Sequence, residues 1–445
     1  MSLDAKPVAN WRLAAYASPA MITYLAWMPL GYVVIKFYAK YTSLDLATIG
    51  LIILIGRLFD AFSDPAIAYL SDKFDTRWGR RKPWILLSAP FFATGFALLA
   101  MPPQDIHWSY FLLANVVLYS GWTFFEVTHI AWGLEFERDF DRRTNIGVLL
   151  KFFAYVGSLA FFAFPFIFNT DPNSTEFTRP VMTALGITVA AAFPVLALLA
   201  VWAVPKEERL GTKPFDAREA VGEIFTNRNF LIYLTAYGLW VLSDGVLIGL
   251  FVVYVDAYHD LSASEGVILL ATYFARVLSV PFAMAMFKRY PRRTMWMLAC
   301  FANAVIFPSI LLFPQGAGAF MYLMAFAAIV GIVDCVIGIL AITMLGDVID
   351  DDAVRTGSDK AASYKASVNI VEKILRAVGI SGAIMLVGFA GLDVGEVNSS
   401  SALLVLLLIL GLGPGLLNFL SALTMRRLTI NTQLNAPVRE LEAAP

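Results

Sequence analysis

Long apolar runs alternate with short polar segments along most of the chain. Each run is close to the roughly 20 residues that a helix needs to cross the hydrocarbon core of a bilayer. The pattern predicts about twelve membrane-spanning helices, six on each side of a polar segment at 205–229. The predicted spans are 13–37, 46–71, 84–101, 108–132, 146–168, 179–204, 230–254, 266–287, 294–313, 320–345, 364–391 and 402–425.

This pattern divides the chain into two six-helix halves, 1–204 and 230–425, with a linker at 205–229 and a tail at 426–445. The composition agrees with a membrane protein. Of the 445 residues, 59% are hydrophobic and 15% are charged, whereas soluble domains have about 45–50% and about 25%. Two cysteines in apolar runs, Cys300 and Cys335, argue against a disulfide framework or a cysteine-based metal site.

Basic residues gather in the loops on one side of the predicted helices, which predicts that this side and both termini are cytoplasmic. The opposite loops contain almost none, with Lys40 and Arg179 as exceptions. We therefore expect a multi-pass protein of the plasma (inner) membrane. The basic residues are Lys73, Arg77, Arg80, Arg81, Lys82, Arg138, Arg142, Arg143, Lys206, Arg209, Lys213, Arg218, Arg228, Lys288, Arg289, Arg292, Arg293, Arg426 and Arg427.

The second predicted span carries Arg57, Asp60, Ser63 and Asp64, and their spacing places the three charged residues on one helical face. An ionised group at mid-membrane costs several kcal/mol, so such residues usually face a polar cavity. Two carboxylates and a hydroxyl are hard oxygen ligands for a small cation, and either carboxylate could instead hold a proton. Arg57 would reduce their mutual repulsion. The alternative is a structural ion-pair cluster that joins two helices.

The fourth predicted span places Trp122, Thr123 and Glu126 within four residues of one another. Glu126 could accept hydrogen bonds from a polar substrate, and Trp122 could stack on it. Lys151, at the start of the fifth span, could pair with Glu126 or extend to the membrane interface.

The second half has its own charged residues deep in predicted spans: Asp244, Arg276, Asp334 and Lys373. Trp240 lies one turn before Asp244 and could form a stacking and hydrogen-bonding pair for a substrate. The alternative is a structural pair between Arg276 and one of the two aspartates. We expect Lys373 to respond to the state of the Asp60 and Asp64 site.

Two motifs make the chain similar to a known family. GRLFDAFSDP at 56–65, followed by WGRRKPWI at 78–85, resembles the glycoside–pentoside–hexuronide:cation symporters, the melibiose-carrier family of the major facilitator superfamily. GDVIDDDAVRTG at 346–357, with SYKASVNIVEK at 363–373, resembles that family's cytoplasmic loop and eleventh helix. The resemblance extends over both halves. It implies an all-α major facilitator fold that works by alternating access between the two halves.

The resemblance also implies roles for individual residues. Asp60, Ser63, Asp64 and Thr123 match cation-binding positions, and Lys373 matches a lysine near them. Glu126 and Lys151 match sugar-contacting positions. Ser63 replaces the asparagine of the melibiose carriers, which leaves sodium and a proton open as the coupling ion. Two departures concern the substrate: residues 11–40 contain no acid, and Ile130 replaces a tryptophan.

The expected function is cation-coupled symport of a sugar or glycoside by a monomer without a cofactor. Asp60 and Asp64 would bind the cation, as a metal site if it is sodium. A lysolipid-like amphiphile is an alternative substrate, because the family's animal relatives carry lysophospholipids. A lateral opening and an apolar half-cavity would favour it, whereas a closed cavity lined by Glu126, Trp240, Asp244 and Arg276 would favour sugar. A membrane enzyme or sensor is a further alternative, but no catalytic motif or nucleic-acid module supports either.

Overall fold

The protein is almost entirely α-helical. The computed structural model describes residues 9–136, 140–205, 226–287, 289–356, 360–395 and 397–429. Most of the predicted linker, including Lys206, Arg209, Lys213 and Arg218, lies outside this part of the chain, as do Arg138, Lys288 and most of the tail. The first half contains α1 (Asn10–Ala17), α2 (Pro19–Tyr32), α3 (Val34–Tyr41), α4 (Leu46–Lys73), α5 (Lys82–Ala100), α6 (Trp108–Phe136), α7 (Phe140–Phe168) and α8 (Arg179–Ala203).

The second half repeats this plan with α-helices joined by short 3-10 and π-helical turns. Its elements are α10 (Arg228–Ala257), η1 (Ser262–Ser264), α11 (Glu265–Phe287), α12 (Arg292–Ile306), η2 (Phe307–Leu312), η3 (Ala317–Ala319), α13 (Phe320–Thr356), α14 (Ala361–Phe389), α15 (Ser400–Leu407), η4 (Leu408–Leu412) and α16 (Gly413–Met425). These elements cover every span predicted from the sequence.

Of the twelve predicted spans, eleven correspond to described segments that are long and apolar enough to cross a membrane. Ten helical segments are long and apolar enough to cross a membrane, and α2 with α3 forms an eleventh span that bends by 59°. Pro29 and Gly31 lie just before this bend, where a missing backbone donor and a flexible residue favour a kink. The twelfth span is α14, which is 29 residues long. It contains more charged residues than a purely apolar span.

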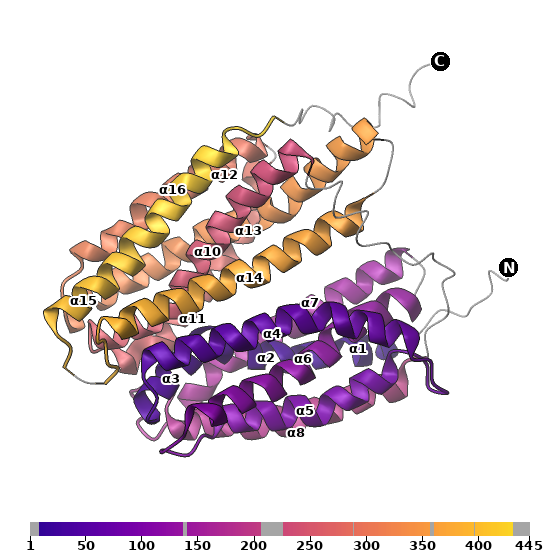
Figure 1. Cartoon of the computed structure of the whole chain (residues 1–445), viewed down its shortest axis with the longest axis horizontal. Coiled ribbons are helices and arrows are strands. Elements are labelled where there is room, and N and C mark those ends of the chain that lie inside the picture. The colour runs from indigo at the N-terminus through magenta and orange to yellow at the C-terminus, as the bar shows by residue number, and fades with distance from the viewer. Residues whose placement is uncertain are drawn as a thin grey trace.

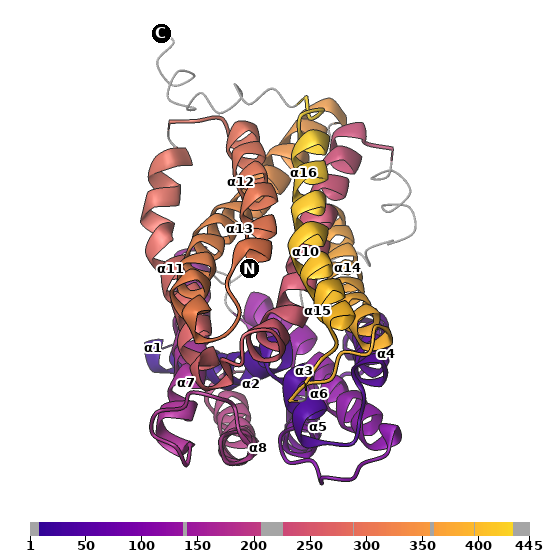
Figure 2. The same ribbon diagram turned by 90° about the vertical axis from the view of Figure 1, so that its left-hand side faces the viewer.

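The two halves lie side by side (Figure 1), with α1–α8 in indigo to magenta and α10–α16 in pink to yellow. Figure 2 shows α4 beside α14 on one side and α7 beside α11 on the other, and both pairs are in contact. The ribbons of the two halves converge toward the left of Figure 1, where α3 and α15 lie. We call this the closed end of the molecule.

Backbone hydrogen bonds join the halves at the closed end. The segment 169–178 between α7 and α8 lies against the start of α11, where the Thr175 amide donates to the Ala263 carbonyl at 2.6 Å. The Phe177 amide donates to Glu265 Oε1 at 2.9 Å. A Cβ added to Gly266 would lie 2.7 Å from the Thr175 carbonyl oxygen, so this contact requires a glycine. The side chains of Arg142 and Arg143 are not described.

One expectation about a loop is wrong. The acidic segment from Gly346 to Ser363 was expected to be a cytoplasmic loop, but α13 continues through it to Thr356. Val348 and Asp352 in this extension are buried, so it packs against the second half. Asp352 accepts a hydrogen bond from Asn227, the N-cap of α10, at 3.2 Å. Packing and this buried polar contact keep the segment helical despite its charge.

Candidate ion and substrate site

The two aspartates of α4 lie beside a hydroxyl pair. Thr123 Oγ1 on α6 donates to Asp60 Oδ1 at 3.1 Å, and the hydroxyl oxygens of Ser63 and Thr123 are 3.0 Å apart. One helical turn separates Asp60 from Asp64, so both carboxylates reach the same region. The structure therefore brings together the four residues expected to form the cation site.

Lys373 of α14 joins this cluster from the other half. Its Nζ atom donates to Asp60 Oδ2 at 3.0 Å and also contacts Asp64 Oδ2. The Lys373 side chain is 31% exposed and that of Asp64 is 24% exposed, so water can reach the bridge. An ammonium group here takes the place that a cation would occupy between the two carboxylates.

One carboxylate oxygen atom of Asp64 has no partner in the described part of the chain and could accept a ligand. Its Oδ1 atom is buried and has no hydrogen-bond partner among the described residues. A buried polar atom without a partner is costly, and a cation or proton at this carboxylate would satisfy it. No group of three or more His, Cys, Asp or Glu side chains in the described ranges is arranged to hold a metal ion. The hydroxyls of Ser63 and Thr123 would thus complete the shell of a weakly bound cation.

Arg57 does not pair with the aspartates as expected. Its guanidinium carbon lies 5.3 Å from the centre of the Tyr119 ring on α6. No ion pair within the described part of the chain involves Arg57, and its buried Nε atom has no hydrogen-bond partner there. Lys373, not Arg57, therefore compensates the charge of the two carboxylates.

Glu126 and Trp122 bind each other on α6. The Trp122 Nε1 atom donates to Glu126 Oε2 at 2.8 Å, and the Trp122 ring packs against Phe92 at 5.6 Å between centroids. Glu126 also lies within electrostatic range of Lys373. Of the two alternatives for Lys151, the pair with Glu126 is absent from the described contacts, and Lys151 is exposed. These contacts place Glu126 beside the ion cluster and leave Lys151 apart from it.

Asp244, Arg276 and Asp334 of the second half each take part in an ion pair. The expected alternative of a pair with Arg276 is found for Asp334, whose Oδ2 atom lies 3.5 Å from Arg276 Nη2. Asp334 Oδ1 accepts a hydrogen bond from Asn303 at 3.2 Å. Asp244 instead pairs with Arg376, because α10 and α14 pack closely there. An added Cβ at Gly245 would lie 2.8 Å from the Arg376 carbonyl oxygen.

Trp240 packs within the second half. Its ring lies 5.8 Å from Tyr237 and 6.4 Å from Trp296 between centroids, and it is 8% exposed. Tyr237 in turn donates to Glu372 at 2.6 Å. The expected stacking of Trp240 on a substrate beside Asp244 therefore stays a prediction that its present packing does not favour.

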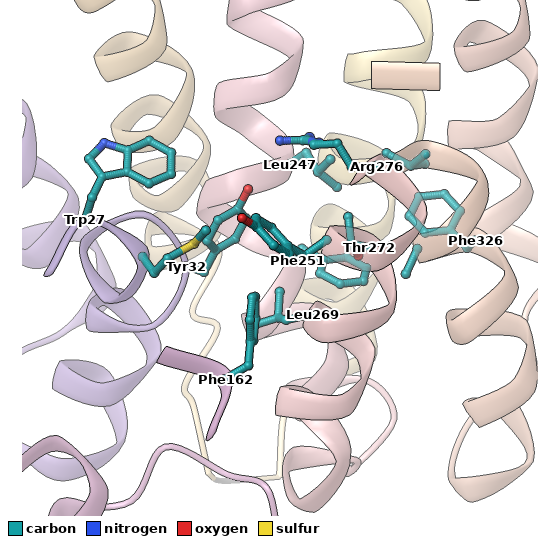
Figure 3. A pocket seen from close by; sticks show the side chains of 13 residues that line it. Trp27, Tyr32, Phe162, Leu247, Phe251, Leu269, Thr272, Arg276 and Phe326 are labelled. Atoms are coloured by element: carbon teal, nitrogen blue, oxygen red, sulfur yellow. The ribbon is translucent and has the colours of Figure 1, made fainter. Parts of the chain in front are cut away.

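A mainly apolar pocket lies between the halves (Figure 3). Trp27 and Tyr32 of α2 and Phe162 of α7 face Phe251 of α10 and Phe326 of α13 across it. It holds about 650 Å³ of empty space, a figure that includes space open to solvent. Among the lining residues, the only side chain that is charged at neutral pH is that of Arg276, beside Thr272 on α11.

The sequence analysis missed a second lysine bridge, at the closed end. Lys36 of α3 is 3% exposed and lies 2.6 Å from Glu265, 3.3 Å from Glu176 and 3.6 Å from Asp256. Lys40, noted as an exception to the charge distribution, pairs with Glu176 at 2.6 Å. Lys40 lies at the end opposite the basic loops, where Glu176, Asp256 and Glu265 also lie. This grouping of opposite charges was the signal in the sequence that could have revealed the cluster.

Comparison with known proteins shows the family. The model of the MFS/sugar transport protein family matches residues 15–432. The chain belongs to this family. It is therefore a multi-pass membrane transporter and not an enzyme, and the resemblance seen in its motifs is confirmed at this level.

Several proteins of the family are similar to the chain. An uncharacterized symporter of Synechocystis, sll1374, is 43% identical over 58 residues, which are 12% of this chain and only 11% of that protein. Sodium-dependent lysophosphatidylcholine symporter 1-B of Danio rerio is 21% identical over 401 residues, 80% of this chain and 76% of the relative. Lactose permease of Lactobacillus helveticus is 22% identical over 382 residues, 79% of this chain and 56% of the relative.

The solved structures agree on the fold. A bacterial homolog of the human lysosomal transporter Spinster, in an inward-facing and unoccupied conformation, matches with a TM-score of 0.67 at 15% identity. The match covers 95% of this chain and 98% of that one. The major facilitator fold expected from the sequence is therefore confirmed.

Proposed function

We propose that this protein is a symporter that couples the movement of a cation to that of a sugar or glycoside by alternating access. The observation that carries the proposal is the contact of Lys373 with Asp60 and Asp64, which joins α14 of one half to α4 of the other. The membership of the MFS/sugar transport family and its similarity to lactose permease support a sugar.

The contact provides a physical basis for coupling. A sodium ion or proton on Asp60 or Asp64 would weaken the hold of both carboxylates on Lys373. The bridge between α4 and α14 would then be released, so the ion would have different affinities for the bridged and unbridged states. Only such a difference in affinity allows a ligand to shift a conformational equilibrium. Ser63 and Thr123 would complete the shell of the ion, and Glu126 with Trp122 would lie beside it.

We assign the other expected roles on the same basis. Asp244, Arg276 and Asp334 line or adjoin the region between the halves and are the substrate contacts offered by the second half, with Trp240 and Lys151 as the weakest candidates. The basic loops favour cytoplasmic termini in the plasma (inner) membrane. The protein would act as a monomer without a cofactor.

A second candidate substrate is a lysolipid-like amphiphile. The mainly apolar walls of the pocket, with Arg276 as the one charged side chain among its lining residues, favour a molecule that has both an apolar part and a polar or anionic part. Glu126, Trp240 and Asp244 do not line this pocket, so this pocket differs from the closed polar cavity expected for a sugar. The similarity to the lysophosphatidylcholine symporter supports the same candidate.

Ion-driven uptake tests the function. We expect Asp60→Asn and Asp64→Asn each to reduce accumulation of the substrate by about 100-fold or more, because each removes a charged ligand of the ion. Asp45→Asn is the matched control, since Asp45 is an exposed N-cap of the same helix that accepts a hydrogen bond from Thr48. Normal accumulation in the Asp60→Asn, Asp64→Asn double variant at normal expression would contradict the proposal.

Thermal stabilisation identifies the substrate class. Purified protein is heated with sugars, glycosides and lysolipids, with and without sodium, at two pH values, because a ligand of the folded state raises its apparent stability. Stabilisation by a sugar that increases with sodium supports sodium–sugar symport. Stabilisation by lysolipids alone favours the amphiphile and leaves the ion site in place.

A further inference from the structure

The two halves are joined at the closed end by a buried cluster of five charged side chains. Lys36 and Lys40 of α3 and Glu176 belong to the first half, whereas Asp256 at the end of α10 and Glu265 at the start of α11 belong to the second. Among the described residues, Lys36 is the member of this cluster whose side chain contacts acids of both halves. It is therefore the link between them.

Burial makes this link hard to break without compensation. The Lys36 side chain is 3% exposed, that of Glu265 is 1% and that of Asp256 is 6%. Separating a buried ion pair leaves each charge without a partner in a region of low polarity, which is costly. A conformation that parts the halves here must therefore hydrate all of these groups at once.

The substrate pocket lies directly below this cluster. Leu269 and Thr272, one and two turns beyond Glu265 on α11, line the pocket, and so does Tyr32, one turn before Lys36. Glu265 also accepts a hydrogen bond from the Phe177 amide at 2.9 Å, so it holds the backbone between α7 and α8 at the closed end. Opening the closed end would consequently give direct access to the pocket.

We propose that Lys36, with Glu265 and Asp256, is the gate that seals the substrate pocket at the closed end and controls its opening to the exterior. The inference rests on the proposed transport function and orientation, in which this end faces outward. These three residues are positioning residues: they act by holding the halves together. Each transport cycle requires Lys36 to leave its two partners on the second half and to return to them.

Lys40 provides a matched control within the same helix. It lies one turn after Lys36, carries the same charge and contacts Glu176 at 2.6 Å, but it has no ion pair with the second half among the described residues. Removing its charge alters the same cluster and leaves the link between the halves. If Lys36 is a gate, removing the charge of Lys36 should open the pocket to the outside and removing that of Lys40 should not. A general electrostatic effect predicts similar opening in both variants.

The test measures access to the pocket from outside. Cys300 and Cys335 are replaced by serine, Thr272→Cys is introduced as a reporter, and intact cells are labelled with a membrane-impermeant maleimide. We expect Lys36→Met and Glu265→Gln to increase the labelling rate by about tenfold or more, because loss of the link shifts the population toward the open state. Lys40→Met should change it by less than about twofold, on the same argument, and Lys36→Arg should keep it low.

Two further measurements keep the result interpretable. Labelling of position 272 from the cytoplasmic side, in inverted vesicles, shows whether a variant is folded. The exchange of charges in the Lys36→Glu, Glu265→Lys variant should restore slow labelling from outside. Unchanged labelling in both Lys36→Met and Glu265→Gln, or an equal increase in Lys40→Met, would overturn the gate.

The labelling experiment needs neither substrate nor coupling ion, so it separates the two proposals. Slow labelling that rises only when Lys36 or Glu265 is changed supports the gate even if no sugar or lysolipid stabilises the protein. Conversely, ion-driven uptake that depends on Asp60 and Asp64 supports the transport function even if the labelling rate does not respond to Lys36.

Discussion

Within the described residues, two lysine bridges join the halves, and they differ in which half supplies the lysine and in how deeply the lysine is buried. Lys373 of the second half contacts Asp60 and Asp64 of the first, and it is 31% exposed. Lys36 of the first half contacts Asp256 and Glu265 of the second, and it is 3% exposed. The same chemistry therefore occurs once where water and ions can enter and once where they are excluded.

This difference separates two roles for the same interaction. The Lys373 bridge is partly hydrated, so under the proposed function replacing its ammonium by an ion would cost less than breaking a fully buried pair. A buried bridge is broken only at a high cost, so the ammonium of Lys36 holds one conformation. We infer that hydration, rather than the identity of the charged groups, makes one bridge an ion site and the other a gate.

The largest expected effect is on stability at the buried bridge. Lys36→Met should lower the free energy of unfolding by about 3–5 kcal/mol, because it leaves Glu265 and Asp256 buried without their partner. Thermal unfolding of the purified protein measures the change. Lys40→Met should cost less than about 1 kcal/mol, since Lys40 is 25% exposed and its pair is partly hydrated. Equal losses of unfolding free energy in Lys36→Met and Lys40→Met would show that the burial of the lysine does not set the strength of its ion pairs.

A smaller effect is expected at the hydrated bridge, where affinity for the ion changes more than stability. Lys373→Met removes the competitor for Asp60 and Asp64, so the cation should stabilise the protein at an about tenfold lower concentration. Sodium titrations at fixed pH and pH titrations without sodium measure this shift. Lys365→Met, an exposed lysine two turns earlier on α14, should leave both titrations unchanged. If Lys373→Met and Lys365→Met gave the same sodium and pH titration curves, Lys373 would not compete with the cation for Asp60 and Asp64.

The smallest expected effect is the pH dependence of Glu176, which lies in the segment between α7 and α8. Burial raises the pKa of this carboxyl, but Lys36 and Lys40 together outweigh burial and hold the pKa below its usual value of 4.5. A carboxyl with a lowered pKa adds stability above pH 4.5, and this contribution is lost as the pH falls through the pKa of the folded state. Glu176→Gln should therefore reduce the loss of thermal stability between about pH 5 and pH 3. If the Glu176→Gln variant lost thermal stability at acidic pH to the same extent as the unmodified protein, Glu176 would not contribute to the acid dependence of stability.

The fold was predictable because membrane-spanning helices depend on local composition. Every predicted span corresponds to a helix or a helix with a short turn, and the bend after α2 follows a proline that the sequence contains. The extension of α13 through 346–356 was not predictable in the same way, since its acids suggested a loop. The buried contact of Asp352 with Asn227 explains it, and that contact joins residues 125 positions apart.

The candidate site was predictable in its members and less so in its pairs. Spacing on α4 was enough to place Asp60 and Asp64 on one face, the family resemblance pointed to Thr123 and Lys373 beside them, and the structure shows the contacts. The partners of Arg57, Asp244 and Lys151 could not be inferred, because which charges meet depends on the packing of helices far apart in sequence. Arg376, which binds Asp244, was not among the residues singled out from the sequence.

The sequence by itself determined that the chain crosses the membrane about twelve times, that its basic loops gather on one side and that acids lie on the second span. These properties follow from residue type and spacing along single helices. Only the tertiary structure decided which charges are paired, which of two lysine bridges is hydrated and where the pocket lies. The physical reason is that pairing and hydration depend on distances between the two halves, which no local pattern specifies.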